Sequence, residues 1–306
     1  MNIVFMGTPD FAVKSLEQII ADGHNVQAVY TKADAPKGRK MVLTPSDVKV
    51  CALEHNLTVY TPSTFKDEAE VERLRALNPD LIVVVAYGKL LPKSVLDIPK
   101  YGCVNVHGSI LPKWRGAAPI QWTVLSGDEY GGVTTMYMNE GLDTGDIILT
   151  RKVKVGENET SGELFDRLCI DGAELLSETI NQIEAGTAPR IPQNNDEATY
   201  ASMLSKEISE IDFSKSASEV HNKVRGLSPW PCAQSKLFGK RIKILETRLC
   251  QKQGEAGKVI SNNPLIVACG EGSVEIVRLQ PEGKRAMYSA DYLMGHSIEI
   301  GTTFGE

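Results

Sequence analysis

Alternating apolar and amphipathic stretches predict that the chain begins with a βαβ unit. An apolar run at 2–6 ends at Gly7, an amphipathic stretch covers 10–21, and a second apolar run follows at 26–30. Strands and helices that alternate in this way form parallel, doubly wound sheets. The uninterrupted apolar run at 81–86 is typical of a central strand that helices cover on both faces.

Further strands and one long helix complete this predicted domain. Apolar patterns indicate strands at 102–106 and 132–138 and an edge strand at 147–155. A helix is predicted over 161–185, where apolar residues recur at helical spacing: Leu164, Phe165, Leu168, Leu175, Leu176, Ile180 and Ile183. We therefore expect an α/β fold with a doubly wound, mostly parallel sheet over residues 1–189.

The pattern changes after this long helix. Residues 186–195 contain two prolines and two adjacent asparagines, the composition of a linker. Apart from a helical pattern at 216–226, the rest predicts short strands and glycine-containing turns, which suggest a small barrel or sandwich. The predicted organisation is a domain at 1–189, a linker at 190–206 and a β-rich domain at 207–306.

Composition narrows the class of protein. The 306 residues are 42% hydrophobic and 24% charged, which excludes a disordered or collagen-like chain. No apolar run approaches the roughly 18 residues of a membrane span, and the first residues lack a signal-peptide pattern, so we expect a cytoplasmic protein. The six cysteines form no CxxC pair and have no histidine at zinc spacing, which predicts reduced thiols and no metal site.

Charge leaves the question of nucleic acid open. The net charge of −6 argues against tight nonspecific binding to nucleic acid. However, residues 1–205 carry −8 and residues 206–306 carry +2. An acidic chain can still bind RNA through local basic patches.

Two polar residues stand at the end of a predicted strand. Asn105 and His107 are two positions apart, so their side chains share one face of the strand. Open α/β sheets bind ligands beyond the carboxyl ends of such strands. An Asn amide can donate to a developing oxyanion, and a His can transfer a proton near neutral pH. A single His at this place is more often a partly buried structural residue, but its neighbours favour a site.

A glycine-rich turn at 139–148 adds Asp143 and Asp146. Aspartates in turns often make only local backbone hydrogen bonds, whereas a carboxylate beside His107 can hold an imidazolium or orient a water. Asn, His and Asp around one crevice suit acyl transfer without a covalent enzyme intermediate, since no Ser or Cys lies in an elbow motif. The lone Gly7 in the first turn and the lack of GxxxxGK[ST] argue against nicotinamide and P-loop nucleotide sites.

The segment that carries these residues also resembles a known signature. NVHGSILPKWRGAAPIQ at 105–121 and GLDTGD at 141–146 resemble the signature of folate-dependent formyltransferases. The resemblance includes FMGTPDFAV near the start, AYGKLLP at 86–92 and VRGLSPWPCA at 224–233, so it covers both predicted domains. It implies a Rossmann-like formyltransferase domain followed by a smaller C-terminal β-barrel (OB-like) domain.

The resemblance also implies an activity. It is the transfer of a formyl group from 10-formyltetrahydrofolate to the amino group of methionine on initiator tRNA, for translation initiation. The basic segment at 31–48 and the PWPCA segment at 229–233 favour this branch of the family. The alternatives are a formyltransferase that acts on an amino sugar nucleotide, and a folate- or RNA-binding module without activity. The family is generally monomeric and needs no metal.

By match to the motif, Asn105 and His107 would stabilise the tetrahedral oxyanion. Asp143 would orient His107 and, through a water, help to move a proton from the amine to the folate nitrogen. The residues implied to bind folate are Ser109, Ile110, Leu111, Pro112, Ala86, Tyr87, Gly88, Leu90, Asn139 and Glu140. The residues implied to bind tRNA are Lys37, Arg39, Lys40, Lys206, Lys236, Lys240, Arg241 and Lys243.

The sequence departs from the family pattern at a few positions. Ile110 and Cys232 stand where Leu and Gly are usual, and KMVL at 40–43 is less basic than usual. In the basic segment after residue 235, Lys236 and Lys240 share one face if the chain stays extended. A turn near Gly239 would be needed to bring all its basic residues into one stripe.

Overall fold

The computed structural model describes residues 1–38 and 40–305, which form two compact units. Unit 1 comprises residues 1–119, 132–153 and 165–200. Unit 2 comprises residues 120–131, 154–164 and the chain from residue 201 onward. Because the two units are interleaved along the chain, the domain boundaries drawn at residues 189 and 207 stay a prediction.

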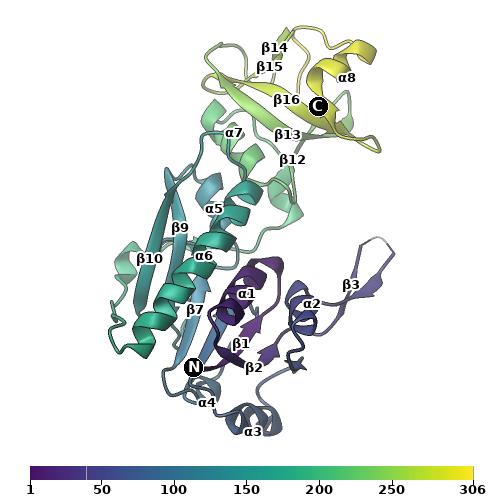
Figure 1. Cartoon of the computed structure of the whole chain (residues 1–306). Coiled ribbons are helices and arrows are strands. Elements are labelled where there is room, and N and C mark those ends of the chain that lie inside the picture. The colour runs from purple at the N-terminus through teal and green to yellow at the C-terminus, as the bar shows by residue number, and fades with distance from the viewer. Residues whose placement is uncertain (39, 306) are drawn as a thin grey trace. The chain divides into compact units, whose positions relative to one another are not determined.

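A seven-stranded sheet forms the centre of unit 1 (Figure 1), with the strand order β10-β9-β7-β6-β1-β2-β5. The strands are β1 (Asn2–Gly7), β2 (Asn25–Tyr30), β5 (Val59–Tyr60), β6 (Leu81–Val85), β7 (Cys103–His107), β9 (Tyr130–Tyr137) and β10 (Ile147–Lys154). Strands β1, β2, β5, β6 and β7 are parallel, and β9 is antiparallel to β7. The predicted α/β fold with a mostly parallel sheet and an edge strand near residue 147 is confirmed.

Helices connect these strands. They are η1 (Asp10–Ala12), α1 (Val13–Ala21), α2 (Asp47–Glu54), α3 (Glu68–Ala76), α4 (Lys93–Leu96) and α6 (Ser161–Glu184). The sequence patterns predicted α1 and α6 but gave no helix at α2 or α3. Helix α3 buries only Val71 and Leu74 among charged neighbours, so its apolar signal is weak, and Asp67 caps it by accepting from the Ala69 amide.

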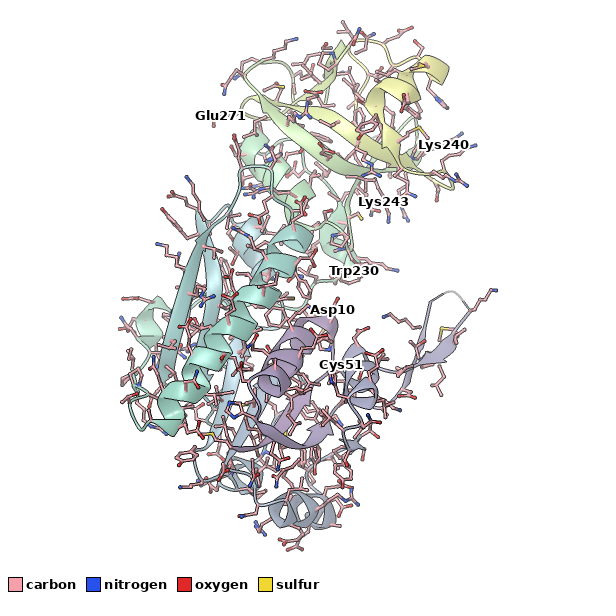
Figure 2. The ribbon with its side chains drawn as sticks, in the orientation of Figure 1. Asp10, Cys51, Trp230, Lys240, Lys243 and Glu271 are labelled. Atoms are coloured by element: carbon pink, nitrogen blue, oxygen red, sulfur yellow. The ribbon has the colours of Figure 1, made fainter. Side chains whose placement is uncertain are left out.

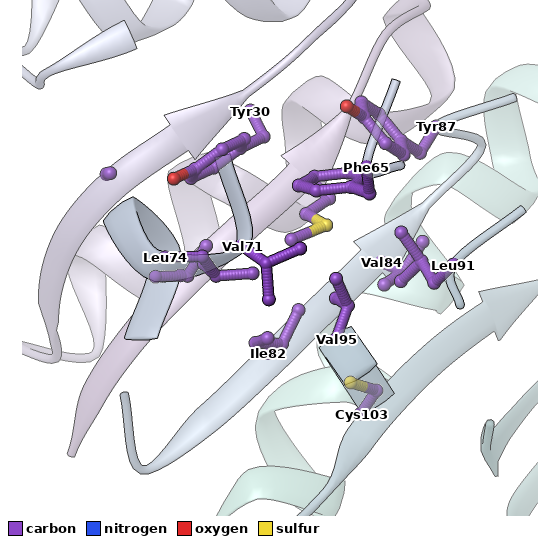
Figure 3. Close-up of a cluster of buried hydrophobic side chains, with 13 residues drawn as sticks. Tyr30, Phe65, Val71, Leu74, Ile82, Val84, Tyr87, Leu91, Val95 and Cys103 are labelled. Carbon is purple, nitrogen blue, oxygen red and sulfur yellow. The ribbon is translucent and has the colours of Figure 1, made fainter. Parts of the chain in front are cut away.

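The core explains why β6 is continuously apolar. All five residues of β6 are buried, which is possible only if both faces of the strand are covered. Figure 3 shows one face, where Ile82 and Val84 of β6 pack with Val71 and Leu74 of α3 and with Val95 of α4. Buried side chains on both faces therefore fix β6 in the middle of the sheet and leave only its ends for a ligand.

Unit 2 is built on an antiparallel sheet of order β12-β13-β16-β15-β14, with β17 paired to β16. Its strands are β12 (Ala233–Leu237), β13 (Lys240–Cys250), β14 (Val259–Asn262), β15 (Leu265–Ala268), β16 (Ser273–Pro281) and β17 (Met287–Tyr288). Its helices are α5 (Pro119–Leu125), η3 (Lys206–Ser209), α7 (Ala217–Gly226) and α8 (Ser289–Gly295). The predicted C-terminal domain of short antiparallel strands is confirmed.

A tight turn joins β12 to β13. Phe238 and Gly239 both have positive φ (52° and 69°), as the two central residues of a type I′ hairpin turn require. Lys236 pairs with Arg241, and Leu237 pairs with Lys240. Because side chains alternate between the faces of a strand, Lys236 shares a face with Arg241 rather than with Lys240. The extended arrangement is therefore wrong, and the turn near Gly239 is present.

Cys232 stands where glycine is usual, in a backbone conformation that favours glycine. Cys232 has a φ of 70°, a left-handed conformation that disfavours residues with a side chain. We expect Cys232→Gly to raise the free energy of unfolding by about 1 kcal/mol, as measured by urea denaturation. The matched control is Cys250→Gly at the end of β13, where glycine should destabilise an extended strand. Equal destabilisation by both variants would contradict this account.

Candidate active site

Strand β7 carries Asn105 and His107 to the carboxyl end of the sheet. It lies between β6, to which it is parallel, and β9, to which it is antiparallel. Asn105 is half-buried, and the His107 side chain is 6% exposed. The two residues alternate with buried Val104 and Val106, so the apolar packing of β7 fixes the face on which both polar side chains lie.

The ring of His107 lies between a carbonyl and a carboxylate. Its Nε2 is 2.9 Å from the carbonyl oxygen of Trp114, and its Nδ1 is 3.7 Å from Oδ2 of Asp143. A carbonyl oxygen only accepts, so Nε2 is the donor of this hydrogen bond. Nδ1 is therefore the ring nitrogen that faces the Asp143 carboxylate. The structure brings His107 and Asp143 together, as the sequence predicted.

Asp143 is held in an unusual conformation. Its φ is 52°, and its Oδ2 accepts a hydrogen bond of 2.8 Å from the amide of Gly116. The surrounding turn is closed by Asn139, whose Oδ1 accepts from the Gly141 amide and from the Thr144 hydroxyl. These contacts fix the backbone on which the Asp143 carboxylate is presented.

The loop that follows β7 is fixed by β9. The hydroxyl of Thr134, a buried residue of β9, donates to the carbonyl of Ser109 (2.7 Å) and accepts from the amide of Leu111 (3.2 Å). The Ser109 hydroxyl donates to the carbonyl of Lys113 (2.6 Å). The sequence patterns assigned no role to Thr134, because a threonine within a strand gives no signal of which loop it supports.

Two of the three groups of predicted folate residues lie in loops that leave the same edge of the sheet, whereas Asn139 and Glu140 follow β9, which runs antiparallel to β7. Residues 86–90 follow β6 and residues 109–112 follow β7, and these strands are parallel neighbours. Tyr87, Ser109 and Leu111 are buried, so their contribution to a ligand would come from backbone groups. The other members of the set are Ala86, Gly88, Leu90, Ile110, Pro112, Asn139 and Glu140, of which Leu90 is 81% exposed. Their role in folate binding stays a prediction.

The buried side chain and the backbone carbonyl of Tyr87 hold the 86–90 loop in place. Its ring packs against Phe65 with 6.4 Å between centroids (Figure 3), and its carbonyl accepts from the Thr8 hydroxyl. Burial raises the pKa of the Tyr87 hydroxyl to about 12, so this side chain stays neutral. The pKa of Lys89 in the same loop is lowered, chiefly by burial and to a smaller extent by the positive charge of Lys32.

The predicted tRNA residues fall in both units. In unit 1, Lys37 ends β3 (Ala35–Lys37), which pairs with β4 (Val42–Thr44), and Lys40 lies exposed in the turn between them. Arg39 lies outside the described residues. The remaining members belong to unit 2: Lys206, Lys236, Lys240, Arg241 and Lys243, of which Figure 2 labels Lys240 and Lys243 on β13. The assignment of these residues to tRNA binding also stays a prediction.

Residues 1–38 and 40–305 lack two features. This part of the chain has no group of three or more His, Cys, Asp or Glu side chains placed to hold a metal ion. It also has no helix that is long and apolar enough to cross a membrane.

Comparisons with known proteins identify the family of the chain. A family model described as "Formyl transferase" matches residues 1–180, and one described as "Formyl transferase, C-terminal domain" matches residues 203–297. Methionyl-tRNA formyltransferases of Lachnospira eligens and Clostridioides difficile are 48% and 46% identical to the chain, and each match covers 100% of both proteins.

The fold is also that of solved formyltransferases. The structure of an N-formyltransferase from Helicobacter canadensis, in complex with folinic acid and dTDP-3-aminofucose, matches with a TM-score of 0.68 and 21% identity. The match covers 91% of this chain and 98% of that one. Because both family models match and the curated relatives align over the whole length, the chain belongs to the family of methionyl-tRNA formyltransferases.

Proposed function

We propose that this protein transfers the formyl group of 10-formyltetrahydrofolate to the amino group of methionine on initiator tRNA. The observation that carries the proposal is similarity over the whole chain to proteins of that name. The placement of His107 beside Asp143 at the end of β7 supports it with a site suited to acyl transfer. Because charged initiator tRNA is a substrate of translation, we expect the protein to act in the cytoplasm. We also expect it to act as a monomer and to need no metal.

The reaction joins an amine to a weakly electrophilic formyl carbon. The amine nitrogen bonds to that carbon and an electron pair moves to the formyl oxygen, and collapse of this oxyanion breaks the bond to the folate nitrogen. Asn105 is half-buried at the sheet edge, so its amide can donate to the oxyanion. In the structure, Nε2 of His107 donates to the Trp114 carbonyl. To donate to the oxyanion, Nε2 must break this hydrogen bond and form one with the formyl oxygen.

One proton must move from the amine to the folate nitrogen as the bonds change. The Asp143 carboxylate lies beside His107 Nδ1 and can accept that proton through a water, then return it to the leaving nitrogen. The Gly116 amide donates to Oδ2 of Asp143 and so orients this carboxylate beside His107. The loops at 86–90 and 109–112 would hold the folate, chiefly through backbone groups.

A direct experiment tests this proposal. The purified protein is incubated with methionyl initiator tRNA and 10-formyltetrahydrofolate, and the amino acid released from the tRNA is identified by mass spectrometry. We expect N-formylmethionine to accumulate together with tetrahydrofolate in equal amounts. A known methionyl-tRNA formyltransferase, assayed in the same buffer, is the positive control. If that enzyme is active and the methionine treated with this protein stays unmodified, the proposal is rejected.

The basic face of the β12–β13 hairpin supports a contact with the RNA backbone. Lys236 pairs with Arg241, and Lys243 lies two residues further along β13, so all three share one face. Each phosphate contact that is lost should lower tRNA affinity and reduce the slope of log affinity against log salt by roughly 0.7–0.9.

We therefore expect Arg241→Gln and Lys243→Gln each to weaken binding and flatten this salt dependence, as measured by filter binding at several salt concentrations. The matched control is Lys252→Gln, an exposed lysine beyond the opposite end of β13. If all three variants keep the salt slope of the unmodified protein, this face of the hairpin does not contact phosphate.

A further inference from the structure

The 190–195 segment, which has the composition of a linker, is packed against unit 1. Ile191 pairs with Ile147 through two backbone hydrogen bonds of 2.8 and 3.0 Å. The Arg190 guanidinium lies over the ring of Tyr137, 3.6 Å from its centroid, and 3.9 Å from Oδ2 of Asp146. The segment is therefore fixed beside the turn that carries Asp143.

Gln193 of this segment contacts the turn directly. Its Nε2 donates to the carbonyl oxygens of Asp143 (2.9 Å) and Gly145 (2.7 Å). A side-chain amide has two N–H donors, and both are used here. Asp143 has a left-handed backbone conformation, and a Cβ at Gly145 would lie 1.6 Å from the Tyr137 carbonyl oxygen. The turn is therefore tightly packed, and Gln193 holds it in one conformation.

A buried arginine fixes the orientation of Gln193. The Gln193 Oε1 accepts from Nε (3.1 Å) and Nη2 (2.8 Å) of Arg115, which also donates to Oδ1 of Asn195 (2.9 Å). Arg115 is 2% exposed. Because a buried charge without hydrogen-bond acceptors is strongly unfavourable, Arg115 keeps the Gln193 oxygen toward itself and the Gln193 donors toward the turn.

Arg115 is also linked to the Asp143 carboxylate through its neighbour Gly116. The Arg115 amide donates to the Thr199 carbonyl (2.9 Å), and the next residue, Gly116, donates its amide to Oδ2 of Asp143. The backbone of Asp143 is thus held through Gln193, while its carboxylate is held through Gly116. Both supports depend on Arg115 and on the segment that follows residue 189.

We propose that Gln193 is a positioning residue for formyl transfer, which holds Asp143 so that its carboxylate faces His107. This inference rests on the proposed function, because Asp143 is given its proton-transfer role there. Gln193 itself lies behind the turn and acts on the backbone of Asp143. Because the same turn carries Asn139 and Glu140 of the predicted folate set, the contribution of Gln193 is read from the rate of the chemical step at saturating folate.

The test begins with Gln193→Glu. A glutamate keeps the length of the side chain and still accepts from Arg115, but it has no donors for the carbonyls of Asp143 and Gly145. We expect the single-turnover rate of formyl transfer to fall about 100-fold, the loss typical of a small misplacement of a reacting group. Folate affinity is measured by fluorescence quenching so that the rate can be taken at saturating folate, and circular dichroism should show a folded protein.

A double-mutant cycle separates positioning from general damage. If Gln193 acts through the Asp143 carboxylate, Gln193→Glu should lower the rate of an Asp143→Asn variant by less than about twofold, because the group that it positions is already lost. Asparagine is chosen because it tolerates a positive φ. The matched control is Gln251→Glu, the same change at an exposed glutamine just beyond β13, and it should keep the rate of the unmodified protein.

Two outcomes would overturn the proposal. One is a Gln193→Glu variant with an unchanged rate, and the other is a loss of the same size in both backgrounds of the cycle. Failure of the proposed function is a separate result, in which the unmodified protein does not formylate charged tRNA. The cycle is then run with an amino sugar nucleotide as the acceptor, so the role of Gln193 is decided in either case.

Discussion

Replacing His107 by alanine is expected to lower kcat by about 10³-fold while folate affinity changes little. His107 is the titratable ring at the carboxyl end of β7, between the Trp114 carbonyl and the Asp143 carboxylate. Its removal takes away both a donor for the oxyanion and the group that faces Asp143. Loss of one such donor costs about 10² to 10³ in kcat, and we expect the upper end here. The measurement is the rate of formyl transfer at saturating substrates, with folate binding followed separately.

The fold must be checked in the same experiment, because His107 is nearly buried. Circular dichroism and thermal unfolding should show a folded His107→Ala protein. The matched control is His55→Ala, an exposed histidine at the end of α2, which should leave kcat unchanged. If the His107 variant loses activity only because it fails to fold, His107 is structural and the assigned role is wrong.

Replacing Asn105 should have the second large effect. Asn105→Ala removes an amide donor at the sheet edge and should lower kcat by about 10²-fold or more. Asn105→Asp keeps the shape of the side chain but places a negative charge where the oxyanion forms, so its kcat should be lower still. Pre-steady-state kinetics with a saturating donor measure both variants. An aspartate variant as active as the unmodified protein would show that this amide does not face the oxyanion.

Much of the fold could be predicted because its signals are local. The apolar run of β6 is continuous since both of its faces are buried, and Gly239 tolerates the positive φ that the turn between β12 and β13 requires. Helix α3 was not predicted, because it buries only Val71 and Leu74 in a charged stretch. Sequence patterns therefore predicted the elements that bury many apolar residues and missed those that bury few.

The candidate site was predictable only in its centre. Asn105 and His107 are two residues apart on one strand, so their common face follows from strand geometry. Gln193 and Asn195 contact Arg115 across 78 and 80 positions of the sequence, and their surroundings of Pro and Asn resemble a linker. No local pattern records that such amides accept from a buried guanidinium, so this support is visible only in the folded chain.

The central claim is that this site formylates methionine on initiator tRNA, and competition between acceptors tests it most directly. The protein receives 10-formyltetrahydrofolate with methionyl initiator tRNA and an amino sugar nucleotide, first separately and then together, and both products are quantified. We expect formylated methionyl-tRNA to be the only product, with no inhibition by the sugar nucleotide. Formylation of the sugar alone would keep Asn105, His107 and Asp143 as the site but would contradict the proposed acceptor and every contact with RNA.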